Sequence, residues 1–249
     1  MKVKSIKIME ILNDLLQFVR PFDSPIEKLF VGVHWTVVMS RVCGIASTQI
    51  EPPPHFNQQI RDVGHLHEKS AFEIGQFAQS EKWLEASVGM AAINSLIEID
   101  ENKCKNENAY DTICEEGAGK NVAIIGHFPF VKKLKSIAGR LWVIELQPRE
   151  GDHDAEKTSE ILPQCDVVGI SATTLINHTL ENVLKYCRQD ALKIMIGPTT
   201  PMSPVLFDYG IDILAGSKIY DPQGIMRGIE QGGNFRQLHG IQVLTMRKQ

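Results

Sequence analysis

One ten-residue segment, Asn121–Phe130, constrains the fold of this chain more than any other. Its first five residues, NVAII, have the continuous apolar pattern of a strand that is buried on both faces. Gly126 ends that strand, a short His-Phe-Pro-Phe loop follows, and the next residues, VKKLKSIAG, have helical spacing. Strand, glycine turn and helix in this order open a βαβ unit, and open α/β sheets bind ligands at the carboxyl ends of their strands. A single glycine lacks the complete G-x-G-x-x-G pattern, so the segment predicts where a ligand binds but not which one.

Strands and helices alternate from this segment onward. Further buried strands are predicted at residues 141–146, 165–173, 192–197 and 212–219. Helices are predicted at residues 131–139, 152–162, 180–189, 203–210 and 222–232. Strands that alternate with helices at this spacing form a parallel sheet with right-handed crossovers. We therefore expect an α/β domain with a parallel sheet over residues 116–249.

The first 115 residues have a different pattern and are predicted to form a smaller α+β domain. Segments 28–41 and 42–50 are rich in β-branched residues and are expected to pair as two antiparallel strands, which the prolines at 52–54 end. Helices are predicted at residues 5–20, 70–80 and 83–99, the last with small residues on one face. A polar segment at 101–120 is expected to join the two domains.

Composition excludes several classes of function. The net charge of −4 and the isoelectric point near 6.1 argue against a nucleic-acid-binding surface, which needs a basic face. No apolar run approaches the roughly 20 residues that span a bilayer, and the N-terminal segment is no signal peptide because it contains acidic residues, so no membrane partner and a cytoplasmic location are expected. The five cysteines are scattered without a C-x-x-C pair, and we interpret them as reduced, mostly buried thiols.

Two loops at the predicted strand ends carry candidate catalytic residues. His127 follows Gly126 and is a candidate general acid or base, because histidine as a residue type titrates near neutrality. The same loop has two interpretations: its backbone N–H groups bind an anion, or it is a tight turn whose phenylalanines pack on the other domain. Glu145 lies 19 residues after Gly126, near the spacing at which an acidic residue binds ribose hydroxyls. The alternative is that Glu145 pairs with Arg140 or Arg149.

Two further loops supply candidate ligand-binding residues. The segment 171–179 gathers hydroxyl and amide side chains before a helix, and Thr173, Thr174 and Asn177 are candidates. Asn177 or Thr179 is expected to cap that helix, and the others are then free for a ligand. Pro198 lies in a loop with three prolines, whose stiffness lets it form a fixed wall.

The first domain offers candidates of its own. His34 and Thr36 interrupt an apolar strand and Asn94 interrupts an apolar helix, so each either bonds a neighbouring backbone group or points into a cleft between the domains. His65 and His67, with Glu68, could form a two-histidine metal site, but such alternation also describes an exposed strand or loop, which is the favoured interpretation. Motifs of the H-E-x-x-H, G-x-S-x-G and Walker types do not occur.

Several segments together resemble a prokaryotic family that pairs an enolase-N-terminal-like domain (DUF4213) with a Rossmann-like domain (DUF364) labelled for heavy-metal chelation. The residues that carry the resemblance are GVHWTVV, VGMAAINS, VAIIGHFPF, VIEL, SATTLINHTLENVL and GPTTPMSPVLFDYG. The resemblance implies two domains with a site between them and leaves the reaction open. If a metal binds, histidine, carboxylate and amide ligands are expected, because the thiols lack chelating spacing.

Three functions follow as hypotheses. The leading one is a protein or enzyme that holds a small polar ligand, or a divalent metal ion, in the cleft between the domains. The alternative is an enzyme of Rossmann type that binds a nucleotide cofactor such as S-adenosylmethionine or a dinucleotide. The third is a metal chaperone without catalysis. Whether the chain forms a homo-oligomer stays open at this point.

Overall fold

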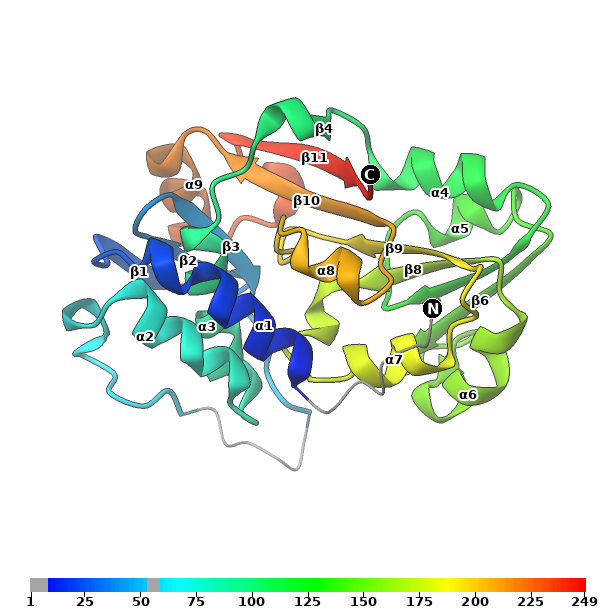
Figure 1. Ribbon diagram of the computed structural model, residues 1–249, viewed down its shortest axis with the longest axis horizontal. Coiled ribbons are helices and arrows are strands. Elements are labelled where there is room, and N and C mark those ends of the chain that lie inside the picture. Colours follow the sequence, from blue (N-terminus) through cyan, green and yellow to red (C-terminus); the bar gives the residue numbers. More distant parts are fainter. Residues whose placement is uncertain (1–8, 53–58) are drawn as a thin grey trace.

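The computed structural model describes residues 9–52 and 59–249, and these form two β-sheets with helices packed around them (Figure 1). A three-stranded sheet has the order β1-β2-β3, and an eight-stranded sheet has the order β4-β11-β10-β9-β8-β5-β6-β7. The residues before 9 in the predicted first helix, and Pro53 and Pro54, lie outside the described residues. No helix in the described ranges combines the length and the apolarity needed to cross a membrane.

The larger sheet is mostly parallel, as the alternating pattern predicts. Its five predicted strands are present as β5 (Asn121–Ile125), β6 (Arg140–Glu145), β8 (Val167–Ser171), β9 (Leu192–Ile196) and β10 (Ile213–Ile219). All neighbouring pairs among them are parallel. The middle strands are buried almost throughout, because helices cover both faces of the sheet.

Three strands of this sheet are missing from the sequence prediction. The long strand β11 (Ile241–Arg247) pairs antiparallel with β10, the short β4 (Cys104–Lys105) adds to β11, and β7 (His153–Asp154) extends the other edge beside β6. Two of the three are only two residues long and the third carries polar residues, Gln242 and Thr245, within its apolar run. Such strands exist because an edge is available for pairing, which local pattern does not reveal.

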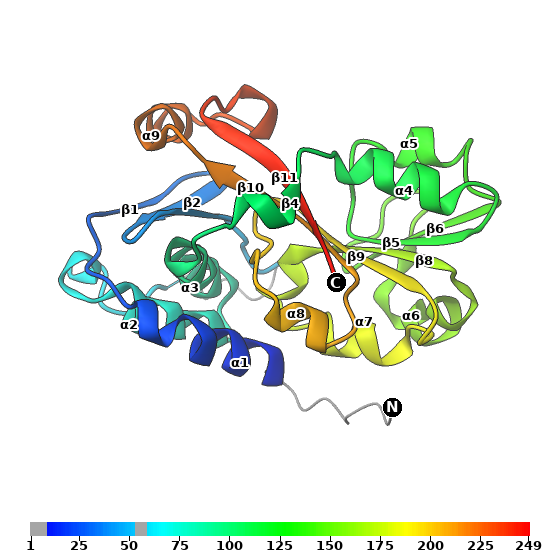
Figure 2. The ribbon, with the colours of Figure 1, turned by 45° about the horizontal axis from the view of Figure 1, so that its top comes forward.

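Helices lie on both faces of the larger sheet (Figure 2). One face carries α4 (Ala109–Gly117) and α5 (Val131–Leu134), and the other carries α6 (Thr158–Ile161), α7 (Leu180–Tyr186) and α8 (Val205–Asp208). Successive residues of each strand therefore enter different cores, as Ile124 packs with Ile113 of α4 and Ala123 packs in the opposite cluster. Several helices are shorter than predicted and continue as 3-10 turns, such as η5 (Ala155–Lys157) and η6 (Leu162–Gln164).

The smaller sheet corrects one prediction. Residues 28–41 do not form one strand; they form β1 (Lys28–Val31) and β2 (Trp35–Met39), joined by a turn in which Gly32 N–H donates to the Trp35 carbonyl at 2.9 Å. The third strand is β3 (Cys43–Ser47), antiparallel to β2. His34 consequently lies in an exposed turn and not within a strand.

Helices from both ends of the chain enclose the small sheet. On one face lies α3 (Trp83–Leu96), which packs with α1 (Glu10–Val19), α2 (Ala71–Gly75) and η3 (Gln76–Gln79). On the other face Val37 and Ile45 pack against Ile225 and Ile229 of α9 (Pro222–Glu230), a helix that follows β10 of the large sheet. One continuous hydrophobic core also joins α1 and α3 to the face of the large sheet that carries α6, α7 and α8. The two sheets are therefore held as one packed body.

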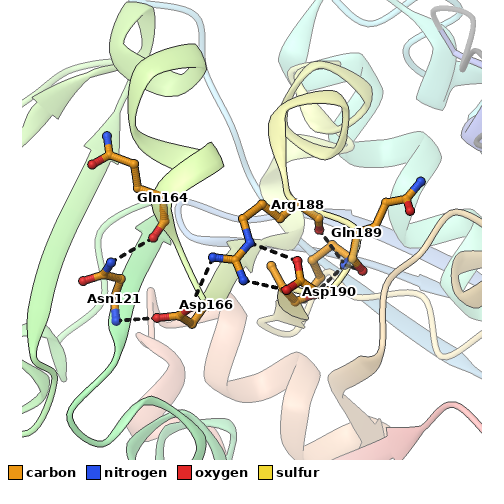
Figure 3. Close-up of polar contacts among 8 residues, drawn as sticks. Asn121, Gln164, Asp166, Arg188, Gln189 and Asp190 are labelled. Atoms are coloured by element: carbon orange, nitrogen blue, oxygen red, sulfur yellow. Dashed lines mark hydrogen bonds and ion pairs between the residues drawn. The ribbon is translucent and has the colours of Figure 1, made fainter.

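A polar network closes the amino ends of the large sheet, on the edge opposite the strand tips (Figure 3). The Asp166 carboxylate accepts the N–H of Asn121 at 3.0 Å and lies 3.3 Å from Nη1 of Arg188. Arg188 also donates to both oxygens of Asp190, at 2.9 and 2.6 Å, and this pairing lowers the pKa of Asp190. The contacts connect the start of β5 to the segments that flank β8 and β9, so this edge is structural.

Close packing of α3 gives a testable prediction. A Cβ added at Gly89 would overlap the backbone of Ala78, whereas one added at Gly75 would lie at ordinary contact, 3.4 Å from Ile93 and 3.5 Å from Leu16. Gly89→Ala should lower the free energy of unfolding by about 1–3 kcal/mol through overpacking. Gly75→Ala should be neutral or stabilising by up to about 1 kcal/mol, because alanine favours helix. Urea unfolding of both variants checks this, and equal stability of the two would contradict it.

Candidate functional site

A cavity of about 1250 Å³ lies at the carboxyl ends of the parallel strands. Its walls include the last residues of β5, β6, β8 and β9, the loops that follow them, and residues of β10. The three-stranded sheet and its helices α1 to α3, called the small unit below, also contribute to the cavity. They supply Trp35, the first residue of β2, and Ser47, the last residue of β3, together with Gln49, Ile50 and Trp83. Both units therefore line one hollow beside the strand tips.

The cavity includes the point where the chain order in the sheet reverses. After β5 the chain adds β6 on one side and then returns to place β8 on the other side of β5. In open α/β sheets, ligands bind at such a switch point, where neighbouring loops diverge. Gly126 follows β5, and Ser171 is the last residue of β8. A Cβ at Gly126 would lie 2.8 Å from Cβ of Ser171. Gly126 also has a φ of 104°, so both its conformation and its close contact require glycine.

His127 lines the cavity beside a carboxylate. Its Nδ1 lies 3.4 Å from Oδ2 of Asp152, whose side chain is only 7% exposed, and the same oxygen accepts the N–H of Arg149 at 3.0 Å. A carboxylate held in this way orients the imidazole, and an oriented histidine side chain is suited to proton transfer. Asp152 is not among the site residues predicted from the sequence. Its run, residues 152–154, contains two carboxylates and a histidine, and this cluster of titratable side chains could have indicated a site residue.

Glu145 lies at the tip of β6 with its carboxylate unpaired. One oxygen accepts the N–H of Leu146 at 3.1 Å, and no basic side chain among the described residues forms an ion pair with it. The alternative pairing with Arg140 or Arg149 is therefore absent, since the Arg140 guanidinium lies 4.4 Å from the Trp142 ring centroid. Glu145 lines the cavity and keeps acceptor capacity for a ligand.

The loop after β8 uses most of its polar groups internally. Thr174 donates its hydroxyl to the carbonyl of Ser171 at 2.7 Å, and the Asn177 side-chain oxygen accepts both the N–H and the hydroxyl of Thr179. No side chain caps α7, so the expected helix cap is wrong. Thr173, whose hydroxyl contacts that of Ser171 at 2.8 Å, is half-buried and lines the cavity with Thr174 and Asn177.

The loop after β9 is hydrogen-bonded to the small unit. The Thr199 hydroxyl accepts the N–H of Ser47 at 2.9 Å, and the Thr199 carbonyl accepts from Nδ2 of Asn94 at 3.0 Å. Asn94 donates as well to the Ile45 carbonyl at 2.9 Å. These bonds fix Pro198 as part of the wall of the main cavity and of a second one of about 150 Å³.

Not every candidate residue meets the main cavity. His34 is exposed in its turn, Thr36 is fully buried with its hydroxyl 3.0 Å from that of Thr48, and neither lines either cavity. Asn94 lines the smaller cavity and not the main one. The Thr36 hydroxyl is paired locally with that of Thr48, and Asn94 Nδ2 donates to two backbone carbonyls, whereas the buried Oδ1 of Asn94 has no hydrogen-bond partner.

Several aromatic and basic residues that were not predicted as site residues also line the cavity. Phe128 and Phe130 stack with ring centroids 5.1 Å apart, Tyr110 lies 5.4 Å from Phe130, and on the opposite side Trp35 lies 5.6 Å from Phe235. The basic residues are Lys133, Arg149 and Arg236. They come from separate loops without a shared motif, so only the folded chain brings them together.

The donor groups of the described residues do not fit a resident metal ion. Within residues 9–52 and 59–249 no group of three His, Cys, Asp or Glu side chains is close enough to hold one. His65 Nδ1 and Glu68 Oε1 lie 2.9 Å apart and form an exposed pair. Neither residue lines either cavity. Burial raises the pKa of the Cys43, Cys165 and Cys187 thiols to about 12, which disfavours the thiolate that soft metals need.

The fold and the cavity define a two-part α/β protein with a site at the tips of a mostly parallel sheet. The DUF364 family model, described as "putative heavy-metal chelation", matches residues 108–248, and the DUF4213 model, with the same description, matches residues 20–97. The chain belongs to the DUF364 family.

Relatives support this assignment. An uncharacterized protein of Methanocaldococcus jannaschii is 31% identical over 189 residues, which cover 73% of this chain and 71% of that protein. A DUF364 protein of unknown function from Desulfitobacterium hafniense has the same fold, with a TM-score of 0.82 at 24% identity over 97% of this chain and 99% of that one. A second, from Pyrococcus horikoshii, has a TM-score of 0.80 at 20% identity over the same shares.

The thiol environment gives a prediction. Because Cys43, Cys165 and Cys187 have raised pKa values, their thiols stay protonated at pH 8 and should react slowly with a thiol-specific disulfide reagent in the native protein. Adding denaturant should make all five cysteines react rapidly. Rapid reaction of all five before denaturation would contradict the burial that the structure gives these thiols.

Proposed function

We propose that this protein binds a small polar organic ligand in the main cavity at the strand tips. The observation that carries the proposal is the convergence of loops from four strands on one hollow, with seven sequence-predicted residues in its lining: Gly126, His127, Glu145, Thr173, Thr174, Asn177 and Pro198. Cavities of this kind at the switch point of an α/β sheet are the usual ligand sites of the fold class.

The roles of the polar side chains follow from their surroundings. His127, oriented by Asp152, accepts or donates a proton at the ligand. Glu145, whose carboxylate has no basic partner among the described residues, accepts a hydrogen bond from a hydroxyl or amine of the ligand. Thr173 adds a hydroxyl from the loop after β8. The proposal leaves open whether a reaction follows binding.

An organic ligand is better supported than a bare metal ion. Among the described residues, the cavity lining contains one histidine and one carboxylate, His127 and Glu145, and no cysteine. A structural or transported metal ion is usually held by three or four protein ligands. The family description of heavy-metal chelation therefore stays an outcome to be tested.

A nucleotide cofactor is the second candidate. In its favour, Glu145 ends the strand next to β5, the position from which acidic residues bind ribose in dinucleotide folds. Against it, the stacked Phe128 and Phe130 follow Gly126, where those folds keep small residues beside a pyrophosphate. The division into units of 1–115 and 116–249, the enolase-like nature of the first, the cytoplasmic location and a homo-oligomer stay predictions.

A ligand screen with matched variants tests the proposal. Thermal unfolding of the wild-type protein is measured against polar metabolites, nucleotide cofactors and divalent metal ions. A ligand that raises the melting temperature should lose its effect in Glu145→Gln, because the neutral amide weakens a charge-assisted hydrogen bond worth about 1.5–3 kcal/mol.

Glu150→Gln is the control for that experiment. Glu150 is exposed, lies five residues further along the chain and does not line the cavity, so its variant should respond to the ligand as the wild type does. Failure of every compound to stabilise the wild type, or an undiminished response in Glu145→Gln, would refute the role given to this carboxylate. Stabilisation by a metal ion alone, with stoichiometric metal retained after desalting, would favour chelation instead.

A further inference from the structure

The charges in the main cavity differ in sign from the charge of the whole chain. The chain carries a net charge of −4, whereas the part of the cavity lining that the structure describes contains three cationic side chains, Lys133, Arg149 and Arg236, and one carboxylate, Glu145. None of the three cations forms an ion pair within the described residues. A cavity with surplus positive charge in an acidic protein attracts anions.

One end of the cavity combines such a cation with hydrogen-bond donors that lack partners. Trp35 Nε1 and Ser217 Oγ are buried atoms without a hydrogen-bond partner, and both residues line the cavity. Arg236 follows Phe235, whose ring packs 5.6 Å from that of Trp35. Ser217 lies on the same face of β10 as Ile219, which packs in one cluster with Trp35 and Phe235. Trp35, Ser217 and Arg236 therefore line the same side of the cavity, the side that β2, β10 and the segment around Phe235 form.

Unpaired buried polar atoms are rare because each one costs about 1–3 kcal/mol relative to a paired one. An indole N–H donates and cannot accept, and a guanidinium also only donates. A cation is therefore a poor occupant of this side of the cavity, and a neutral hydroxyl does not use the charge of Arg236. A phosphate or carboxylate group satisfies the indole, the hydroxyl and the guanidinium together.

We propose that Trp35, Ser217 and Arg236 form an anion subsite, which holds the phosphate or carboxylate group of the ligand in the main cavity. This inference rests on the proposed function of that cavity and adds the chemical class of the ligand. The subsite lies on the side of the small unit, so the acidic group of the ligand contacts Arg236 while its polar remainder extends toward Glu145 and His127.

The anion reaches the covered donors when the Phe235 side chain moves aside. Phe235 lies in η8 (Phe235–Gln237), a single turn whose Arg236 and Gln237 are exposed and whose Asn234 and Gln237 cap it reciprocally. A short surface turn held by its own capping bonds shifts without unfolding the sheet beneath it. Trp35 then exchanges a contact with Phe235 for a hydrogen bond to the ligand.

Binding of inorganic pyrophosphate and of citrate tests the subsite. Both probes are titrated by calorimetry and by thermal shift at constant ionic strength, and they distinguish a phosphate-binding from a carboxylate-binding site. At least one should bind the wild type at millimolar concentration or below, and Arg236→Gln should weaken that binding at least tenfold. Arg227→Gln is the matched control, because Arg227 is an exposed arginine on α9 that forms no ion pair in the described chain and does not line the cavity.

A second variant separates ligand binding from stability. Trp35→Phe keeps an aromatic side chain but removes the indole N–H, so pyrophosphate or citrate should bind more weakly, while circular dichroism and urea unfolding verify that the variant is folded. Equal weakening in Arg236→Gln and Arg227→Gln, or no binding of either probe, would overturn the anion subsite. Stabilisation of the wild type by uncharged polar compounds only would also overturn it, yet would leave the proposed function in place.

Discussion

The contact between Thr199 and the small unit is the interaction on which the site depends. The Thr199 hydroxyl and carbonyl accept hydrogen bonds from the Ser47 backbone and from Asn94, and Thr199 is 1% exposed. Buried bonds of this kind are costly to leave unmade, so they fix the loop after β9 against the end of β3. Together with the hydrophobic core that joins the two sheets, this contact closes one side of the cavity. With it, Trp35 and Ser47 of one unit face Gly126 and Ser171 of the other.

The same arrangement explains why the cavity has two chemically different ends. On the side of the three-stranded sheet it is lined by Trp35 and Ser217, whose buried Nε1 and Oγ have no hydrogen-bond partner, and by the cationic Arg236. Toward the strand tips, Glu145 accepts hydrogen bonds and His127 lies beside Asp152. A ligand with an acidic group at one end and hydroxyl or amino groups at the other matches both. At the amino edge of the sheet, the contacts of Asp166 with Asn121 and Arg188 connect neighbouring segments (Figure 3).

Much of the large sheet was predictable from local pattern. Strands such as NVAII are buried on both faces, and their apolar runs between glycine turns identify them. The prediction was incomplete for β11 and wrong for residues 28–41, where the turn at Gly32 splits one apparent strand into two. At the site, Gly126, His127, Glu145 and the loop residues after β8 and β9 line the cavity because strand ends meet at one edge of a parallel sheet. For His34, Thr36 and Asn94, a polar residue within an apolar segment did not indicate a position in the main cavity.

The sequence by itself determined the alternation of strands and helices, the parallel sheet and the edge at which candidate side chains gather. These follow from hydrophobic periodicity and from glycine and proline positions, which act over a few residues. Only the tertiary structure decided that Asp152 lies beside His127, that Asn94 is hydrogen-bonded to the loop after β9, and that Trp35, Ser217 and Arg236 line the same side of the cavity. Such contacts join residues far apart in the chain, and their partners are selected by packing between elements, which no local pattern encodes.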